Sequence, residues 1–279
     1  MKVGFVLPRY GPEIHGGAET AGRLLAERLR DVPGWSVEVF TTCARDTVTW
    51  ADEYLPGEEV VNGVTVHRFG SRPKDVGAFD RLSRAVFPAP EALGDAEARE
   101  WVEMQGPVAP DLVDAAEASD CDLVTFHPYL YWPTVEGVAR LGARSVLHPA
   151  THDEPPIRLS VFRGVFEGAG GRVFWTDEER VLAERLFPAI AAAPQTVLGI
   201  GVESRDGDGA AARESLGLGD RPYLLCLGKV TEMKGTSMLA RFFAAWKERN
   251  PGPLALVFAG PVVDGPPAHP RRGRRGPGR

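Results

Sequence analysis

The sequence has few cysteines and no long apolar run. Its three cysteines, Cys43, Cys121 and Cys226, are far apart, with no Cys-x-x-Cys pair, and no histidines cluster at ligand spacing. Neither a disulfide framework nor a zinc site is therefore expected, and we predict no bound metal or other cofactor. The longest apolar runs, such as residues 254–259, are far too short to cross a bilayer, so no transmembrane segment is predicted.

An excess of positive charge is also absent. The chain of 279 residues has a formal net charge of -6, which argues against nucleic-acid binding, because such proteins usually present a basic face. The exception is a basic cluster at residues 271–279. The first residues hold one lysine and a short apolar run before Pro8, which indicates a first strand and not a secretion signal. We therefore expect a cytoplasmic protein.

What the sequence does contain is an alternation of short apolar runs with amphipathic helical stretches. In residues 18–30, for example, Ala21, Leu24 and Leu25 share one helical face. Such alternation is typical of βα units that form a mostly parallel sheet, so we predict an α/β fold. Strands are predicted at residues 2–7, 36–42, 64–69, 122–126, 144–148, 173–176 and 196–200, and helices at 18–30, 110–118, 134–141, 157–166 and 177–187.

This pattern stops once and then restarts. Residues 203–220 are charged and rich in Gly and Ala, which suits a linker with a short helix, so residues 1–202 are predicted to form a complete N-terminal Rossmann-like domain. A strand at 223–228, a helix at 236–248 and a strand at 254–259 then predict the first βαβ unit of a second domain, residues 221–264. Residues 265–279 lack core-forming side chains, and we expect them to be disordered. Because two parallel strands cannot bury both faces of a sheet, the second domain is predicted to be incomplete, or completed by something else.

The turn after the first strand is the first candidate binding site. Gly16 and Gly17 directly precede a predicted helix, where backbone N–H groups and the helix dipole favour a phosphate. A tight turn without a ligand is an equally weighted interpretation. The spacing is not Gly-x-Gly-x-x-Gly, and Thr41 and Thr42 stand where an acidic residue would bind ribose, so a nicotinamide or flavin cofactor is disfavoured.

Several segments resemble the family 4 glycosyltransferases, which are retaining enzymes with the two-domain GT-B fold. Residues 16–19 (Gly-Gly-Ala-Glu) resemble the family's N-terminal signature, and residues 227–235 (Leu-Gly-Lys-Val-Thr-Glu-Met-Lys-Gly) resemble the segment that opens its C-terminal domain. Lys229 stands where arginine is usual. Residues 148–155 and 199–203 also resemble stretches of this group. The resemblance extends over residues 1–263, and it implies a GT-B fold.

The resemblance implies roles for two basic residues and one histidine. Lys229 and Lys234 would contact the diphosphate of a nucleotide sugar, together with Gly16 and Gly17, and two cations at a strand end can neutralise a departing diphosphate. Solvated surface lysines are the plainer interpretation of this pair. His127 follows the strand at 122–126, at the end where α/β sheets bind ligands, and the resemblance implies that it assists at the reacting carbon of the sugar.

Other segments have two interpretations each. His152, Asp153 and Glu154 could line the same cleft, with Gly201 near the interdomain hinge, or the first three could cap a following helix. The aromatic residues at 128–133 could stack on a sugar or belong to the core. Residues 74–107 fit the pattern poorly. They could face the acceptor or touch a membrane surface peripherally, although packing over the sheet edge is the favoured interpretation.

The function implied is transfer of a sugar from a nucleotide sugar to an acceptor hydroxyl of a glycan or lipid-linked molecule, with retention and without metal. The family's Glu-x7-Glu segment is absent, and a premature end or frame change near Gly265 would account for that. The alternative is a truncated, inactive remnant that binds only acceptor or a partner, and it predicts exposed apolar surface over residues 230–263. A sugar-nucleotide epimerase of the same architecture is a weaker third option, because no matching carboxylate set is found.

Overall fold

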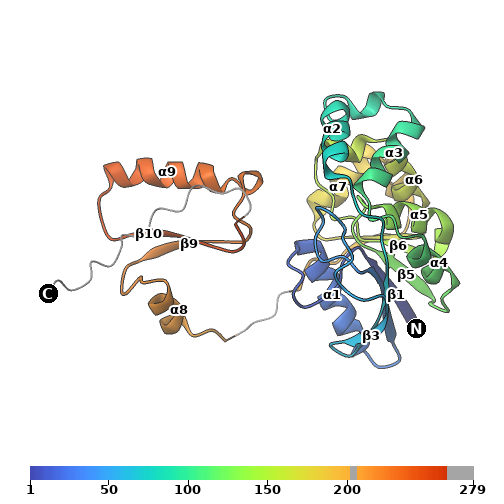
Figure 1. Ribbon diagram of the computed structural model, residues 1–279, viewed down its shortest axis with the longest axis horizontal. Helices are drawn as coiled ribbons and strands as arrows, with labels where there is room; N and C mark the ends of the chain where they lie inside the picture. The colour runs from blue at the N-terminus through green and yellow to red at the C-terminus, as the bar shows by residue number, and fades with distance from the viewer. Residues whose placement is uncertain (202–205, 263–279) are drawn as a thin grey trace. The chain divides into compact units, whose positions relative to one another are not determined.

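The computed structural model describes residues 1–201 and 206–262 (Figure 1). The chain divides into two compact units, Met1–Val202 and Glu203–Arg279. The tail predicted to be disordered, residues 265–279, lies outside the described residues, as do residues 203–205 of the predicted linker. In the described part, no helix has both the length and the apolar character needed to cross a membrane.

The first unit is built on one eight-stranded sheet with the strand order β3-β4-β2-β1-β5-β6-β7-β8. All neighbouring strands are parallel except β3, which runs antiparallel to β4 at the edge. The chain therefore adds β2, β3 and β4 on one side of β1 first, and then adds β5 to β8 on the other side. The strands are β1 (Lys2–Leu7), β2 (Ser36–Thr42), β3 (Gly57–Val61), β4 (Val64–Phe69), β5 (Leu123–Phe126), β6 (Ser145–Leu147), β7 (Gly171–Phe174) and β8 (Gln195–Val197).

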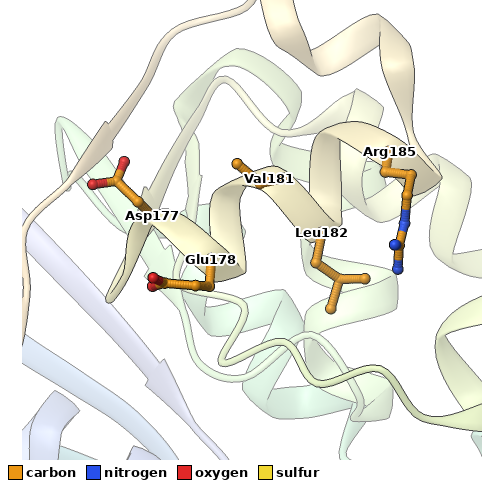
Figure 2. A pocket seen from close by; sticks show the side chains of 5 residues that line it. All are labelled: Asp177, Glu178, Val181, Leu182 and Arg185. Atoms are coloured by element: carbon orange, nitrogen blue, oxygen red, sulfur yellow. The ribbon is translucent and has the colours of Figure 1, made fainter.

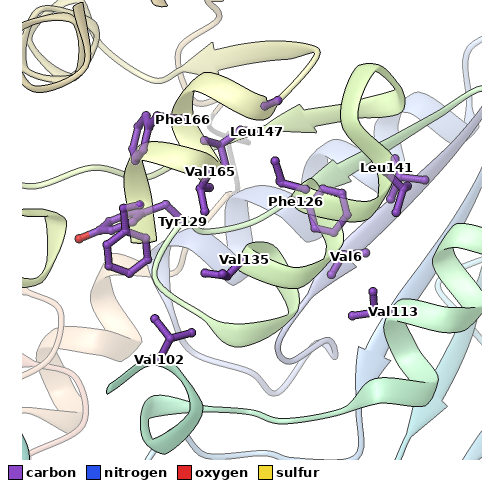
Figure 3. Close-up of a cluster of buried hydrophobic side chains, with 14 of the residues drawn as sticks. Val6, Val102, Val113, Phe126, Tyr129, Val135, Leu141, Leu147, Val165 and Phe166 are labelled. Atoms are coloured by element: carbon purple, nitrogen blue, oxygen red, sulfur yellow. The ribbon is translucent and has the colours of Figure 1, made fainter. Parts of the chain in front are cut away.

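Side chains that alternate along β1 feed two separate cores. Phe5 and Leu7 pack with Ala26 of α1 (Gly17–Arg30) on one face, whereas Val6 joins the larger core on the other face. That larger core, part of which Figure 3 shows, includes Phe126 and residues of helices α4 (Pro110–Ala118), α5 (Trp132–Leu141) and α6 (Val161–Gly168). Helices on both faces are what a mostly parallel sheet requires, so the predicted α/β class is confirmed.

One edge strand was missing from the strands predicted by the sequence. β3 is exposed along most of its length and contains two glutamates, so it lacks the apolar run that marked the other strands. The signal that could have found it is the Asn62-Gly63 pair between β3 and β4. Both residues have positive φ, 48° and 79°, as a two-residue hairpin turn demands.

The segment at residues 74–107 forms two helices, α2 (Val76–Val86) and α3 (Asp95–Gln105), joined by the short turn η1 (Pro90–Ala92). Its aromatic side chains point inward. The Trp101 ring lies 5.4 Å from the ring of Phe79 and 6.0 Å from that of Phe87, and all three pack in the larger core. The apolar residues of this segment are therefore mainly core residues.

The other helical elements of the first unit are short except for α7 (Asp177–Leu186), which begins where it was predicted to begin. The Thr176 hydroxyl accepts a hydrogen bond from the backbone N–H of Glu179, 3.1 Å away, and caps the helix. The short turns are η2 (Gly142–Arg144), η3 (Pro155–Arg158) and η4 (Pro188–Ala192).

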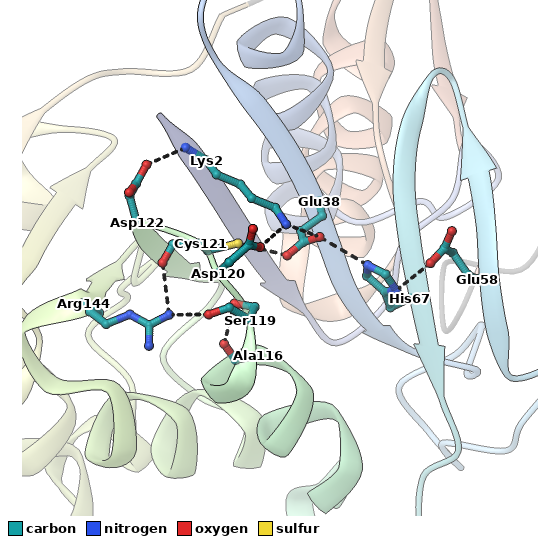
Figure 4. A network of polar contacts seen from close by, with 10 residues as sticks. All are labelled: Lys2, Glu38, Glu58, His67, Ala116, Ser119, Asp120, Cys121, Asp122 and Arg144. Atoms are coloured by element: carbon teal, nitrogen blue, oxygen red, sulfur yellow. Dashed lines mark hydrogen bonds and ion pairs between the residues drawn. The ribbon is translucent and has the colours of Figure 1, made fainter.

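A network of polar contacts lies at the end of the sheet where its parallel strands begin (Figure 4). The Glu38 carboxylate lies 3.2 Å from Lys2 Nζ and 3.4 Å from His67 Nε2, and it accepts a hydrogen bond from Cys121 Sγ at 3.0 Å. Burial and this hydrogen bond raise the pKa of the Cys121 thiol to about 12. This end is opposite the C-terminal strand ends where α/β sheets bind ligands. We therefore interpret the network as a contribution to the stability of the fold.

The second unit contains one βαβ arrangement, with β9 (Tyr223–Leu227) and β10 (Ala255–Ala259) paired in parallel and α9 (Thr236–Arg249) between them in sequence. A short helix, α8 (Gly209–Ser215), precedes it. Its apolar side chains are poorly covered in the described part of the chain: Leu227 is 79% exposed and Phe242 is 65% exposed. This unit therefore lacks the two covered faces that the first unit has.

Candidate functional site

The strand order places the switch between the two halves of the sheet at the C-terminal ends of β1 and β5. The chain leaves β1 toward β2 on one side of the sheet and later returns to β5 on the other side, which makes this a topological switch point. Ligands of open α/β sheets bind at such points. The β1–α1 turn with Gly16 and Gly17 follows one of these strands, and His127 directly follows the other.

A buried ion pair organises the β1–α1 turn. The Arg9 guanidinium pairs with the Glu19 carboxylate in the first turn of α1, and both side chains are at most 10% exposed. Arg9 Nη1 also donates a hydrogen bond to the backbone oxygen of Arg45 at 2.9 Å. A Cβ at Gly16 would meet the Glu19 carboxylate and would force that side chain to shift, whereas Gly17 has open space around its Cβ position. The open side of this turn is thus at Gly17, the first residue of α1.

His127 is held in the sheet beside a second histidine. Its ring is 2% exposed and stacks on the His148 ring, with 4.1 Å between centroids. Nε2 lies 3.0 Å from the Thr125 hydroxyl, while the buried Nδ1 has no hydrogen-bond partner among the described residues and lies 3.5 Å from the Cβ position of Gly22 on α1. Burial, assisted by His148, lowers the pKa of His127 well below its usual value, so the ring is neutral at neutral pH.

The loop after β6 forms another wall of this end of the sheet. Glu154 Oε1 accepts a hydrogen bond from the hydroxyl of the fully buried Tyr129, two residues after His127, at 2.8 Å. Glu179 fixes the loop from α7, because its carboxylate accepts from the backbone N–H groups of Thr151 and Trp175, both at 2.7 Å. Glu154 is thereby brought to the same strand ends as His127.

The remaining candidates of the first unit are placed differently. His152 and Asp153 are exposed, and Asp153 pairs with Arg158 and Arg185, which hold the pKa of its carboxyl below the usual value. Helix capping by these residues is not observed, since η3 begins after Glu154 without a side-chain cap. Gly201 is exposed with open space around its Cβ position.

The two candidate lysines belong to the second unit. Lys229 follows β9, and Lys234 ends the short turn η5 (Glu232–Lys234) just before α9. Hydrogen bonds hold the segment between β9 and α9 in place. The Val230 N–H donates to Pro261 O at 2.9 Å, and the Thr236 hydroxyl donates to Thr231 O at 3.0 Å. Both lysines are exposed, and no carboxylate of residues 1–201 or 206–262 forms an ion pair with either. The two lysines therefore lie in the connection between the end of β9 and the N-terminus of α9, and helix N-termini are places where anions can bind.

A hollow on α7 contains none of the predicted site residues (Figure 2). Asp177, Glu178, Val181, Leu182 and Arg185 line it, all from one helix. Within the described residues, no group of three or more His, Cys, Asp and Glu side chains is arranged to hold a metal ion. Sequence reasoning did not find Arg9, because only the fold shows that it meets Glu19.

Comparison with known proteins shows the fold. No protein-family model matches the chain, and no curated protein sequence matches it. Among solved structures, a sucrose-phosphate synthase from Thermosynechococcus elongatus is similar, with 17% identity, 91% of this chain and 61% of that chain covered, and a TM-score of 0.55. The Anabaena protein HepE in complex with UDP and glucose is 15% identical, with 94% and 62% covered and a TM-score of 0.54.

A trehalose-phosphate synthase (UDP-forming) from Burkholderia vietnamiensis gives similar values: 15% identity, 94% of this chain and 64% of that chain covered, and a TM-score of 0.58. The chain thus spans less than two thirds of the length of each of these proteins. The likeness, together with the mostly parallel sheet of the first unit, shows that this chain has a GT-B type α/β fold.

Proposed function

We propose that this chain is a glycosyltransferase that moves a sugar from a nucleotide sugar to an acceptor hydroxyl. The observation that carries the proposal is the β9–α9 connection, where Lys229 and Lys234 lie beside the N-terminus of α9 without carboxylate partners in the described part of the chain. A nucleoside diphosphate is the leaving group, and it gains negative charge as the sugar departs. Two cations and a helix dipole stabilise that charge.

The finer parts of the proposal rest on the resemblance to family 4. The bond between the anomeric carbon and the diphosphate oxygen breaks, a bond to the acceptor oxygen forms with retention, and the acceptor proton is released. His127 would hydrogen-bond the donor sugar, with Gly16 and Gly17 near the phosphates. Because the His127 ring is 2% exposed, this role requires the residues that cover the ring to move aside. Lysines would replace metal, and the acceptor would be a glycan or a lipid-linked molecule in the cytoplasm.

Nucleotide binding tests the proposal. Isothermal titration of the whole chain with UDP, GDP and ADP is expected to show that one of the three nucleotides binds with a micromolar dissociation constant. UDP is the first choice because HepE is in complex with UDP and the Burkholderia vietnamiensis synthase is UDP-forming. In the Lys229→Ala, Lys234→Ala double variant the affinity should fall by about a hundredfold, since each charged contact to phosphate contributes roughly 1.5 kcal/mol.

The matched control removes two positive charges elsewhere on the same unit. Arg241 and Arg249 are exposed on α9, and the Arg241→Ala, Arg249→Ala double variant should bind the nucleotide as the parent chain does. A folded parent chain that binds none of the three nucleotides would refute the proposal. Equal loss of affinity in both double variants would instead mean that Lys229 and Lys234 have no specific role.

A second candidate function is favoured by the surface of the second unit. Within residues 230–262, Met238, Phe242 and Val262 are 48%, 65% and 72% exposed, as the non-catalytic alternative predicts. A chain of this kind would bind an acceptor or a partner protein through its first unit and would have no donor affinity. The same titration separates the two functions, because only the transferase binds a nucleotide.

A further inference from the structure

The N-termini of helices α1 and α3 are alike in sequence but differ in their hydrogen bonds. Each helix follows a glycine, Gly16 or Gly94, and each has a glutamate at its third position, Glu19 or Glu97. A glutamate at this position commonly reaches back and accepts a hydrogen bond from the N–H group that precedes the helix. Glu97 does so, because its Oε2 accepts from the Gly94 N–H at 2.8 Å. The Gly16 N–H donates no hydrogen bond to any residue that the structure describes, although Glu19 is in place to accept one.

Arg9 accounts for this difference. Its Nη2 pairs with Glu19 Oε1, and its Nη1 donates to the backbone oxygen of Arg45 at 2.9 Å, so the guanidinium is anchored at a second point. The Glu19 carboxylate lies so close to Gly16 that a Cβ there would meet it, and a small movement would bring it to the Gly16 N–H. Glu97, by contrast, forms no ion pair within residues 1–201 and 206–262.

Stability alone gives little reason for this ion pair. Both side chains are at most 10% exposed, and the cost of removing two charges from water offsets much of the attraction between them. Arg9 Nε is also buried and has no acceptor among the described residues, whereas buried polar atoms are usually hydrogen-bonded. One N–H of the cation beside this turn is thus left for an anionic oxygen or a water molecule. An ion pair of this kind can select one conformation of the chain even where it adds little stability.

We propose that Arg9 is a positioning residue, which holds the Glu19 carboxylate off the Gly16 N–H and so keeps the β1–α1 turn open to a phosphate of the nucleotide sugar. The part of this inference that concerns the phosphate rests on the proposed function. Without Arg9, the Glu19 carboxylate would act as Glu97 does and accept from the glycine N–H. Its negative charge would then be unpaired and would repel a phosphate. Arg9 therefore fixes the direction of the carboxylate and also neutralises its charge.

The first test observes Gly16 directly and needs no ligand. His15-Gly16 is the one His-Gly pair in the sequence, so labelling the whole chain with 13C-carbonyl histidine and 15N-glycine selects the Gly16 amide in an NMR spectrum. Hydrogen exchange of this amide should slow by about tenfold in Arg9→Met, because the freed carboxylate now accepts from it. In the Arg9→Met, Glu19→Met double variant, which has no carboxylate at this position, exchange should be as fast as in the parent chain.

The second test is UDP titration of the same three chains. The affinity should fall about tenfold in Arg9→Met, since the phosphate must displace a charge-assisted hydrogen bond, and it should recover in the double variant. A merely structural role would give no recovery, because the double variant also lacks the ion pair. Arg23 and Glu27 form a matched pair on α1, at 2.8 Å and with side chains 13% and 17% exposed, and Arg23→Met should change neither measurement.

Unchanged Gly16 exchange in Arg9→Met would overturn the inference, as would a loss of UDP affinity that the double variant shares. If Arg9→Met does not fold, Glu19→Gln replaces it, because its amide oxygen still accepts from Arg9. This variant should keep the parent's UDP affinity, and a tenfold loss would overturn the inference. The two proposals fail separately: if the Gly16 amide responds as expected and no chain binds UDP, GDP or ADP, the positioning of Glu19 by Arg9 stands and the proposed function fails.

Discussion

The stacked rings of His127 and His148 make the first unit sensitive to acid. Burial lowers the pKa of His148 to about 4 and that of His127 well below its usual value, so both rings are neutral when the protein is folded. In the unfolded chain they take up protons below about pH 6.5. Their contribution to stability is therefore complete above pH 6.5 and is lost as the pH falls from there toward 4, at up to about 1.4 kcal/mol per pH unit for each residue.

Replacement of one ring tests this sign. His148→Phe keeps a flat ring against His127 but removes one titrating group, and no hydrogen bond of the His148 ring to another described residue is lost. The slope of unfolding free energy against pH between 6.5 and 4 should become shallower by about 1.4 kcal/mol per pH unit. Urea unfolding across that range measures it. His15 is exposed, so His15→Gln should leave the slope as it is, and an unchanged slope in His148→Phe would contradict the account.

Single residues of the site were predictable only where their position in sequence determined their role. Gly16 and Gly17 directly precede the first predicted helix and His127 directly follows an apolar strand, and the strand order places the turn after β1 and the end of β5 at the same end of the sheet. Arg9 gave no such signal. Its environment depends on Glu19, ten residues away, and this contact arises only from the fold.

At the scale of elements, buried strands were predictable and the exposed one was not. The predicted bounds of β1, β2 and β4 agree with the structure, because each strand contains several apolar side chains that the structure buries. The edge strand β3 is stabilised by its hairpin with β4 and not by burial, so its amino-acid composition gives little indication of a strand. The helix predicted at residues 157–166 is instead the turn η3 followed by α6, since Pro155 and Pro156 begin a separate short turn.

The β3–β4 turn and helix α6 predict opposite effects for the same substitution. Gly63 has a φ of 79°, and an added Cβ would meet the Arg30 guanidinium, so Gly63→Ala should destabilise the chain by about 1 kcal/mol. Gly164 lies within α6 with nothing near its Cβ position, so Gly164→Ala should stabilise it by up to about 1 kcal/mol. Thermal unfolding of the two variants beside the parent chain checks both signs. A lower melting temperature for Gly164→Ala would count against the helix.

At the scale of the whole molecule, the two units are covered to very different degrees. The first buries Trp50, Trp101 and several phenylalanines completely, with helices on both faces of its sheet. In the second, Leu224 and Leu225 of adjacent positions on β9 are 50% and 53% exposed, although they point to opposite sides of the strand. Both faces of the β9–β10 pair are therefore open to solvent in the described part, which agrees with the expectation that two parallel strands cannot cover themselves.

The candidate site is divided in the same way. Gly17 and His127 belong to the first unit, and Lys229 and Lys234 of the β9–α9 connection belong to the second. Each part has a structure that suits its proposed ligand when considered by itself. The proposed sugar transfer involves candidate residues of both units, so a turnover measurement tests more of the proposal than a binding measurement does.

The most direct test is release of nucleoside diphosphate by the whole chain from UDP-, GDP- and ADP-sugars, with and without phosphorylated and neutral sugars as acceptors. The account predicts release from one donor that depends on an acceptor, falls at least a hundredfold in the Lys229→Ala, Lys234→Ala variant, and yields a product that keeps the anomeric configuration of the donor. A folded chain that releases no diphosphate from any donor, with any of the acceptors, would contradict the claim that it is a glycosyltransferase.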